Sequence, residues 1–361
     1  MASSSPTRES KRNNRKTLFS MPVNSMSPIP PLAVLLGDPA GIGPEMAARL
    51  LSNPSNLNAF PLLIIGDECV WEDAQRVAGA RIDTQVVRDI NDISPASGQV
   101  PLLDIDALGG QLPERGQSTE LAGRASFLAL ERAIDLVSEG RASGILFAPL
   151  NKHSLKLGGL EAEDELRHMQ ERFGVPGFVC EFNITDALWT SRVTSHVPLR
   201  EVADHLSIEG VIEAVNLIDD ALRRSGLSQP RIAVCGLNPH AGDGGSIGRE
   251  EIELIGPAVR EAMARGLVVS GPYPSDTVFI RARRGDFDAV VCMYHDQGQI
   301  AMKLMGFDHG VTLHGGLPVP VATSASGSAF DIAGKGVANV QGLQRAFDLC
   351  VRMASAPRVV A

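Results

Sequence analysis

Three histidines follow short apolar runs, and the repeated pattern is a candidate for shared chemistry. The segments "VTSHVPL", "GLNPHAGDGG" and "MYHDQGQ" carry His196, His240 and His295. Imidazole is a good ligand for borderline divalent cations, so three of them suit Zn²⁺, Co²⁺, Ni²⁺ or Mn²⁺. A single histidine is more often structural or merely exposed. The recurrence of one pattern, rather than any one residue, therefore favours a metal site.

Carboxylates and lysines near these segments extend the candidate site. Asp296 follows His295 directly, and Asp276 lies in "SDTVF" after another apolar run. Lys152 and Lys303 are the two lysines nearest to such loops, and each can bind a carboxylate or move a proton. A solvated surface position explains a lysine equally well, so both interpretations stay open.

An acidic cluster stands in "GLEAEDELRHM", residues 159–169. Glu161, Glu163, Asp164 and Glu165 fall within five positions. One interpretation is a solvated helix start, because the positive end of the helix dipole favours acids. The other is the lining of a site that binds something basic or polar.

Two glycine-rich segments are candidates for binding a nucleotide. "GDPAGIGPE", residues 37–45, resembles a phosphate cradle at a helix N-terminus but is equally typical of a tight turn. In "SGSAFDIAGKGVAN", residues 326–339, Asp331 can accept hydrogen bonds from ribose hydroxyls, and the glycines allow a sharp loop. A nucleotide loop and a simple turn are equally good interpretations of this second segment.

The elements that position these residues follow an alternating pattern. Apolar runs predict strands within 31–38, 60–67, 144–150, 187–199, 231–240, 267–273 and 287–296. Helical spacing predicts helices over 119–140 and 208–226, and in "PEMAARLLS", "CVWEDAQRVAGA" and "QGLQRAFDLCVRMAS". This alternation favours an α/β fold with a largely parallel sheet and helices on both faces. In such sheets, functional groups gather beyond the carboxyl ends of the strands.

Composition limits the class of protein. The 361 residues carry a net charge of −9, which argues against a nucleic-acid binder. The five cysteines form no CxxC pair, which indicates a reducing, cytoplasmic compartment. No apolar run is long enough for a membrane span. Residues 1–30 are polar and basic, and we expect a disordered tail there.

Six motifs, in order along the chain, resemble one known family. They are "GDPAGIGPE", "APLNK", "GLNPHAGDGG", "SDTVF", "MYHDQG" and "GSAFDIAGKG". Together they resemble the 4-hydroxythreonine-4-phosphate dehydrogenase family of pyridoxine biosynthesis, from about residue 31 to the C-terminus. The segment 326–339 is also similar to the adenosine-binding loop of the isopropylmalate and isocitrate dehydrogenases.

The resemblance implies a two-lobed α/β/α sandwich, isopropylmalate dehydrogenase-like, with the active site in the cleft between the lobes. Residues 31–148 and 308–361 would form the NAD-binding lobe, and residues 149–307 the lobe for metal, substrate and dimerisation. The implied assembly is a homodimer with a metal site shared across the interface. His196 would come from one subunit, and the other two histidines from its partner.

Together with the residue types, the resemblance suggests roles. The three histidines would bind the divalent ion, which is Zn²⁺, Co²⁺, Mn²⁺, Ni²⁺ or Mg²⁺. Lys152, Asp276 and Lys303 are the candidate catalytic residues, and Lys303 would also contact the substrate. NAD is expected at Gly327, Ser328, Ala329, Asp331 and Asn339. The implied reaction oxidises a 3-hydroxy acid with loss of CO₂, and the metal stabilises the developing negative charge.

The sequence departs from the family where relatives hold a phosphorylated substrate. Glu163 and Asp164 stand in place of a His-Thr pair, Val321 replaces an arginine, Thr312 an asparagine and Ser326 a histidine. A phosphate carries about −1.5 to −2 charges. Like charges about 4 Å apart repel by roughly 4 kcal/mol at an effective dielectric constant of 20. These changes predict weak phosphate binding.

Three functions remain as hypotheses. The favoured one is an NAD- and metal-dependent dehydrogenase for a non-phosphorylated 3-hydroxy acid, which would contact Glu163, Asp164, Thr312, Val321 and Lys303. One alternative is a genuine 4-hydroxythreonine-4-phosphate dehydrogenase with another phosphate anchor, and another is a carboxylated cis-dihydrodiol dehydrogenase. A paralogue that binds a ligand without turnover is disfavoured by the intact histidine set.

Overall fold

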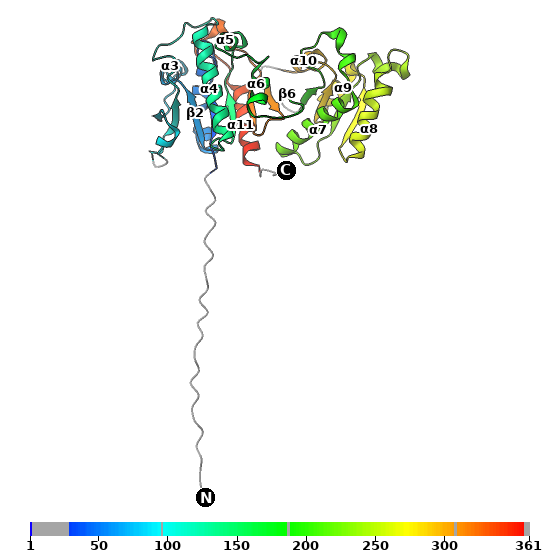
Figure 1. Ribbon diagram of the computed structural model, residues 1–361, viewed down its shortest axis with the longest axis horizontal. Helices are drawn as coiled ribbons and strands as arrows, with labels where there is room; N and C mark the ends of the chain where they lie inside the picture. The colour runs from blue at the N-terminus through cyan, green and yellow to red at the C-terminus, as the bar shows by residue number, and fades with distance from the viewer. Residues whose placement is uncertain (2–28, 95–96, 186–187, 307–308, 357–361) are drawn as a thin grey trace.

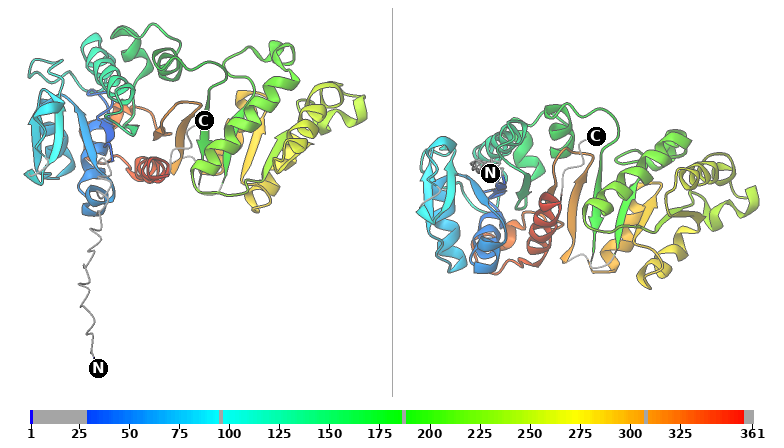
Figure 2. Two further views of the ribbon diagram at one scale, coloured as in Figure 1. Left: turned by 60° about the horizontal axis from the view of Figure 1, so that its bottom comes forward. Right: turned by 90° about the horizontal axis from the view of Figure 1, so that it is seen from below.

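A computed structural model describes residues 1, 29–94, 97–185, 188–306 and 309–356. The predicted tail of residues 1–30 lies outside the described residues, apart from Met1, Ile29 and Pro30. In the described part, one long sheet runs through the molecule with helices on both sides (Figures 1 and 2). This confirms the predicted α/β class.

The sheet has twelve strands. Their bounds are β1 Leu32–Leu35, β2 Leu62–Gly66, β3 Thr84–Val87, β4 Val100–Asp104, β5 Gly144–Phe147, β6 Cys180–Ile184, β7 Trp189–Arg192, β8 Ile232–Cys235, β9 Val269–Tyr273, β10 Ala289–Cys292, β11 Val311–Gly315 and β12 Val321–Ser324. Their order across the sheet is β3-β4-β2-β1-β5-β12-β11-β6-β7-β10-β8-β9. Strands β11 and β12, from the end of the chain, therefore lie in the middle of the sheet.

The strands form two parallel blocks that run in opposite directions. The block from β3 to β12 is parallel throughout, and so is the block from β7 to β9. Between them, β11 is antiparallel to both β12 and β6, and β6 is antiparallel to β7. The prediction of a largely parallel sheet is thus confirmed for each block, but the antiparallel centre was not predicted.

Eleven α-helices are found in the described part. They are α1 Gly43–Leu51, α2 Pro54–Ala59, α3 Glu68–Ala78, α4 Glu120–Ser138, α5 Lys152–Leu157, α6 Glu165–Arg172, α7 Ile208–Arg224, α8 Gly256–Ala264, α9 Ser275–Arg283, α10 His295–Leu304 and α11 Gln341–Ser355. Several begin at side chains that cap them, as sequence rules predict. Thr119 caps α4, Asn151 caps α5 and Ser207 caps α7. None of these helices is both long and apolar enough to span a bilayer.

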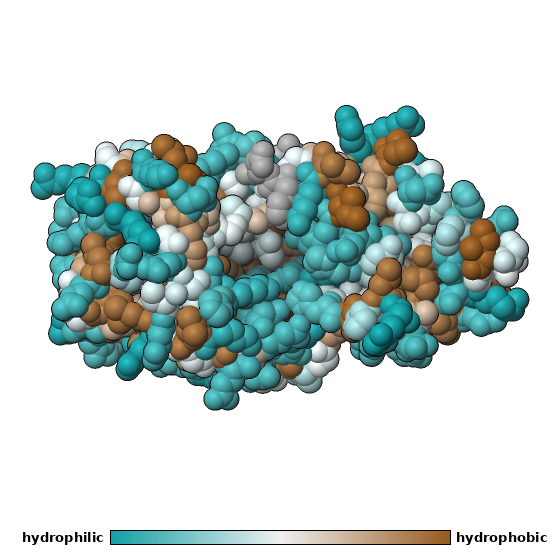
Figure 3. Space-filling model, turned by 90° about the horizontal axis from the view of Figure 1, so that it is seen from above, coloured by the Kyte–Doolittle hydropathy of each residue, from teal (hydrophilic) through white to brown (hydrophobic). Residues whose placement is uncertain are grey.

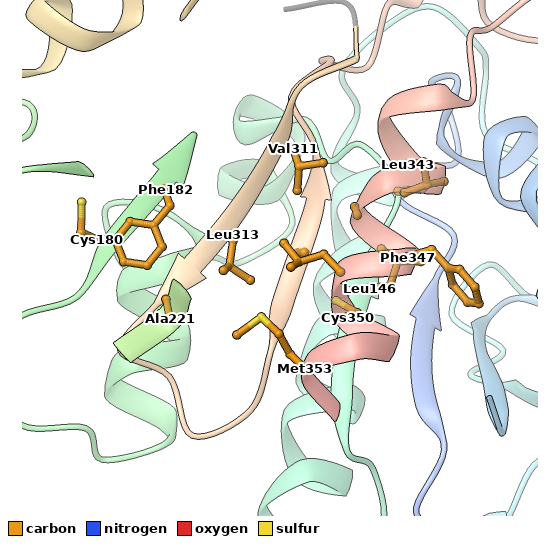
Figure 4. Packing of buried hydrophobic residues seen from close by; sticks show 14 of the residues in the cluster. Leu146, Cys180, Phe182, Ala221, Val311, Leu313, Leu343, Phe347, Cys350 and Met353 are labelled. Carbon is orange, nitrogen blue, oxygen red and sulfur yellow. The ribbon is translucent and has the colours of Figure 1, made fainter. Parts of the chain in front are cut away.

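The core lies on both faces of the sheet, because most strands are apolar on both sides. One face packs against α1, α3, α7, α8 and α11. The other face packs against α4 and α6 at one end and against α9 and α10 at the other. Figure 4 shows Met353 of α11 on the side of the helix that faces Leu313 of β11, and Phe347 on the opposite side. Because side chains alternate along a strand, Thr312 and His314 must point to the opposite face.

The predicted elements are present, and the unpredicted ones share a cause. All seven predicted strand regions contain a strand, and the five predicted helices form. The strands not predicted include β6 "CEFNI", β11 "VTLHG" and β12 "VATS", which mix polar with apolar residues. Their apolar pattern is too short to be recognised without the neighbouring strands that pair with them.

Candidate active site

Two of the three candidate histidines lie side by side. Strands β7 and β10 are parallel neighbours, and His196 and His295 follow their ends. The centroids of the two rings are 5.9 Å apart. Nδ1 of His196 is 2.6 Å from a carboxylate oxygen of Glu163, and Nδ1 of His295 is 2.8 Å from one of Asp296. An ionised carboxylate only accepts, so each Nδ1 donates, and Nε2 is the nitrogen that can bind another ligand when the ring is neutral.

His240 follows β8, the next strand beyond β10, and lies in a tight loop. The segment Pro239–Gly245 contains consecutive residues with left-handed backbone angles, beginning at His240 with φ 54°. The carboxylate of Glu251 holds the start of this loop by accepting the backbone N–H groups of Leu237 and Asn238 at 2.7 and 2.8 Å. Within the described residues, the three histidines do not meet in one cluster of potential metal ligands, and of the three only His196 belongs to such a cluster, with Glu163 and Asp164.

The acidic cluster contains a helix start, as one interpretation predicted, but Asp164 and Glu165 are buried there and not solvated. Asp164 is buried and caps α6 by accepting the backbone N–H of Arg167 at 2.9 Å. Its other oxygen is 4.0 Å from Nζ of Lys152. Glu163 turns instead to His196, and ligand atoms of Glu163, Asp164 and His196 lie within 4.8 Å of one another. The segment is therefore a helix start that also lines the histidine site.

A small cavity connects the start of α6 with the sheet. The charged or titratable side chains that line it are Glu163, Asp164, Glu181, Arg167, Arg192 and His196. On the face seen in Figure 3, a hollow lies between the two ends of the molecule, with hydrophilic side chains around much of it. A larger apolar pocket, beside Leu57, Phe60 and Val100, lies at the amino ends of β2 and β4 and contains none of the candidate residues.

A row of charged side chains crosses the sheet beneath α6. His314 of β11 is the register partner of Glu181 on β6. Glu181 forms a 2.8 Å ion pair with Arg192 of β7, whose side chain is 5% exposed. Burial works to raise the pKa of Glu181, but the charges of His314 and Arg192 outweigh it and lower the pKa to about 2. Sequence reasoning missed this row, although a charged residue inside each short strand was the available signal.

The other predicted substrate and catalytic residues are more scattered. Thr312 is half-buried in β11, where its register partners are Thr323 of β12 and Asn183 of β6. It precedes His314 by two residues and lies on the same face of the sheet. Val321 is fully buried in the core. Asp276 lies in the first turn of α9, and Lys303 lies near the end of α10; both are exposed. Lys152 begins α5 and is exposed beside Asp164.

The glycine-rich loop after β12 is held by α1. Glu45 accepts the backbone N–H groups of Gly334, Gly336 and Ala338 at 3.1 to 3.3 Å. Of the residues predicted to bind NAD, Gly327, Asp331 and Asn339 are exposed, Ala329 is half-buried and Ser328 is buried.

The "GDPAGIGPE" segment is a buried turn that braces the same loop. The backbone N–H of Ile42 donates to the carbonyl of Ser328 at 3.0 Å, and Asp38 accepts the N–H of Ala40 at 2.8 Å. A side chain on Gly41 would collide with Ser328. Because residues 40–48 are buried, the N-terminus of α1 has no room for a phosphate, and the turn interpretation is the better one.

Comparison with known proteins decides the family. Residues 58–350 match the sequence model of the family described as "Pyridoxal phosphate biosynthetic protein PdxA". The chain belongs to the PdxA family. This confirms the resemblance drawn from the six motifs.

Relatives of this PdxA-family chain are named as dehydrogenases. A Pseudomonas aeruginosa protein with the provisional name 4-hydroxythreonine-4-phosphate dehydrogenase 2 is 51% identical over 333 residues, which is 90% of this chain and 97% of the relative. A Bradyrhizobium diazoefficiens protein, provisionally named D-threonate 4-phosphate dehydrogenase, is 37% identical and covers 90% of this chain and 96% of its own length.

Solved structures agree with the fold of the PdxA-family chain. The 4-hydroxythreonine-4-phosphate dehydrogenase of Klebsiella pneumoniae is 34% identical with a TM-score of 0.76, over 92% of this chain and 100% of that one. A terephthalate 1,2-cis-dihydrodiol dehydrogenase of Burkholderia xenovorans is 26% identical with a TM-score of 0.64, over 90% and 98% of the two chains. The structural relatives of this chain thus carry names that differ in substrate.

Proposed function

We propose that this PdxA-family chain is an NAD- and divalent-metal-dependent dehydrogenase that oxidises a non-phosphorylated 3-hydroxy acid with loss of CO₂. The observation that carries the proposal is the histidine pair. His196 and His295 lie together, and each is oriented through Nδ1 by a carboxylate. Histidines that bind metals in proteins are commonly held in this way, which fixes the tautomer and aims Nε2 at the ion.

The residues fit a divalent metal ion. His196 and His295 supply two imidazole ligands from one chain, and His240 is the third candidate. Within the described residues, the rings of His196 and His295 are in contact, and we propose that a second subunit supplies His240. This differs from the grouping of His240 with His295 that the family resemblance implies. Glu163 and Asp296 are positioning residues, since they act through the rings. When bound, the ion would stabilise negative charge on the substrate oxygen.

The loop after β12 fits the adenosine half of NAD. Its exposed backbone at Gly327 and the exposed carboxylate of Asp331 are available to ribose hydroxyls. A carboxylate there disfavours the 2′-phosphate of NADP, because the two would repel. Glu45 holds the far side of the loop in place. NAD⁺ would supply the hydride acceptor for the reaction.

Side chains of the protein would accept the released proton and bind the substrate carboxylate. As the carbinol carbon gives up its hydride, the hydroxyl proton must pass to a base, and Lys152 is the lysine that borders the acidic cluster and the histidine site. The 3-keto acid then loses CO₂, and the resulting enolate takes a proton. Lys303 is the proposed contact for the substrate carboxylate, with Asp276 beside the metal.

The charge of the small cavity supports a non-phosphorylated substrate. Glu163, Asp164 and Glu181 bring three carboxylates to the cavity, against the guanidinium groups of Arg167 and Arg192. Arg192 is already paired with Glu181. A dianionic phosphate at this place would meet repulsion of several kcal/mol. A hydroxyl- or amine-bearing end is compatible with the same lining.

A substrate screen tests the proposal. Purified protein is incubated with NAD⁺, Mn²⁺, Co²⁺ or Zn²⁺, and matched phosphorylated and non-phosphorylated 3-hydroxy acids, and NADH absorbance is followed. We expect turnover with a non-phosphorylated acid, its loss with EDTA and its return with metal. Efficient turnover of 4-phosphohydroxy-L-threonine alone would overturn the substrate assignment.

The second candidate is a 4-hydroxythreonine-4-phosphate or D-threonate 4-phosphate dehydrogenase. The names of the relatives favour it. Lys152 at the start of α5 and Arg167 in the first turn of α6 are the basic groups that would then anchor the phosphate. The same screen separates the two, because Arg167→Gln should abolish turnover only in the phosphorylated case.

A further inference from the structure

The turn that carries His196 has a backbone conformation that needs support. His196 lies four residues beyond the end of β7 and has φ 51°, in the left-handed region. A residue other than glycine stays in this region only where its surroundings hold it there. The position of the imidazole therefore depends on the contacts that fix the residues just before it.

One set of contacts continues the pairing of β7 with β10. The backbone N–H of Val193 donates to the carbonyl of Cys292 at 2.9 Å. The N–H and the hydroxyl of Thr194 both donate to the carbonyl of Met293, at 3.2 and 2.8 Å. These bonds fix the first half of the turn against the end of β10, and the last of them lies two residues before His196.

A second set of contacts comes from Arg192, the last residue of β7. Its side chain is 5% exposed, and its Nε donates to Oγ of Ser195, the residue before His196. The other two nitrogens donate to Glu181 of β6, to the backbone carbonyl at 3.2 Å and to Oε2 at 2.8 Å. Because a guanidinium group is planar, its two bonds to Glu181 fix the direction in which Nε meets Ser195.

We propose that Arg192 is a positioning residue for His196 and acts through Ser195. Glu181, Arg192 and Ser195 are here called the arginine bridge, because they join the His196 turn to β6. The inference rests on the proposed function, in which His196 binds the metal ion. It adds a residue that would touch neither the ion nor the substrate, yet would set the affinity for the ion.

The arginine bridge and Glu163 would control different parts of His196. Glu163 bonds to Nδ1 and so orients the ring. A bond to the ring does not fix the backbone, because two side-chain torsions separate the ring from Cα. The bridge holds the residue that precedes His196, and its side chains line the same small cavity as Glu163 and His196. Together they would restrict both the ring and the chain that carries it.

The simpler interpretation is an ion pair that only stabilises the sheet. Such a pair needs the bonds between Arg192 and Glu181, and it gives Nε no role. In the structure, Nε bonds to a residue of the turn, beyond the end of the strand. Ser195 therefore offers a test, because its hydroxyl can be removed while the ion pair stays.

The ring signals of the histidines test the arginine bridge without metal or turnover. The metal-free full chain is labelled with ¹⁵N-histidine, and nuclear magnetic resonance spectra are recorded for the wild type, Ser195→Ala and Ser195→Thr. The variant His196→Ala assigns the signals of His196. In the wild type we expect the tautomer with the proton on Nδ1. Ser195→Ala should give a mixture of tautomers at His196 and leave the other histidines unchanged. Ser195→Thr should restore the wild-type signals, because threonine keeps the hydroxyl.

Metal affinity is the second readout. Competition with a chelator measures binding of Zn²⁺ or Co²⁺. Ser195→Ala should bind the ion about tenfold more weakly, at the lower end of the loss expected when a ligand loses its support. Ser195→Thr should bind it as the wild type does. Ser228→Ala, at an exposed serine in the loop after α7, is the matched control and should change neither readout.

The outcomes separate the arginine bridge from the proposed function. Wild-type His196 signals in Ser195→Ala, with or without a loss of stability, would overturn the bridge. If Ser195→Ala does not fold, Arg192→Lys is the second variant with the same expectation, because one ammonium group cannot reproduce the planar fork. If the wild type binds no divalent ion, or if affinity is unchanged in a variant whose His196 signals have moved, the proposed metal site fails. The ring signals would still judge the bridge.

Discussion

At the scale of single residues, the site depends on carboxylates that act through histidines. Asp296 holds His295, with a carboxylate oxygen 2.8 Å from Nδ1 of the ring. Asp296→Asn should weaken binding of Mn²⁺ or Zn²⁺ about 10- to 100-fold, as loss of such partners does. Competition with a chelator measures the affinity, and Asp92→Asn, an exposed acid far from the site, is the control. Unchanged affinity would remove Asp296 from the metal site.

Glu181 makes the stability of the protein depend on acid. Its pKa is lowered from 4.5 to about 2 by His314 and Arg192, against the effect of burial. A carboxyl with a lowered pKa stabilises the fold above its unfolded value, so this contribution is lost as the pH falls from 4.5 toward about 2. In Glu181→Gln, the denaturant midpoint should fall less steeply over this window. An identical pH profile in the variant would contradict the assignment.

Residue types predicted much of the site but not its buried part. His196, His295 and the acids of residues 159–169 were recognised from the sequence, because each stands in a short polar segment that follows an apolar run. The row of Glu181, Arg192 and His314 was not recognised. Its members come from three strands that only the sheet brings together, and no local pattern links residues so far apart in the chain.

At the scale of elements, the residue before α6, Asp164, is both a helix cap and a charge near the site. Asp164 caps the helix, and its charge lies beside the cavity. Asp164→Ala should lower the free energy of unfolding by about 0.5 to 2 kcal/mol, the usual cost of a lost cap. Asp164→Asn should keep the cap, because asparagine also accepts from the backbone.

Comparison of these two variants separates the cap from the charge. If Asp164 repels phosphate, Asp164→Asn should bind phosphorylated acids more tightly than the wild type while unfolding at the same denaturant concentration. Equal stability of the alanine and asparagine variants would show that the cap contributes nothing measurable.

The pairing of α1 with the loop after β12 is the second prediction at this scale. Glu45 is 3% exposed and accepts three backbone N–H groups, of Gly334, Gly336 and Ala338. Glu45→Ala should destabilise the protein by about 2 to 4 kcal/mol, because buried donors lose their acceptor. It should also raise KM for NAD⁺ more than it lowers kcat. A normal KM for NAD⁺ in a folded variant would separate this loop from the cofactor.

The same pairing shows why the sequence alone left "GDPAGIGPE" ambiguous. Its glycines are needed because the chain passes close to Ser328 and Pro149, both distant in sequence. A glycine-rich turn before a helix has the same local pattern whether the space beyond it is open to a phosphate or filled by another loop. Only the packed structure distinguishes the two.

At the scale of the whole molecule, the proposed dimer can be tested by mixing inactive chains. His196→Ala and His240→Ala should each abolish activity. If the metal site draws these two ligands from different subunits, a mixed dimer has one intact site. Half of the dimers in an equal mixture are mixed, so about a quarter of the wild-type activity should return.

No activity would return if each site were built within one chain, because every chain in the mixture lacks a ligand. Co-purification of an untagged variant with an affinity-tagged one checks that subunits exchange. This experiment also bears on the predicted lobes. Strands from residues 31–148 and 308–361 fill one end of the sheet and those from 149–307 the other, and the functions assigned to the two lobes remain predictions.

The position of β11 and β12 has a consequence for the growing chain on the ribosome. These two strands are synthesised last, yet they fill the gap between β5 and β6. Until they emerge, both halves of the sheet present an open edge of unpaired backbone groups, which is a template for pairing with other chains. A nascent chain that stalls before Val311 is therefore left with two unpaired edges, and we expect chaperones to be needed most during the final part of translation.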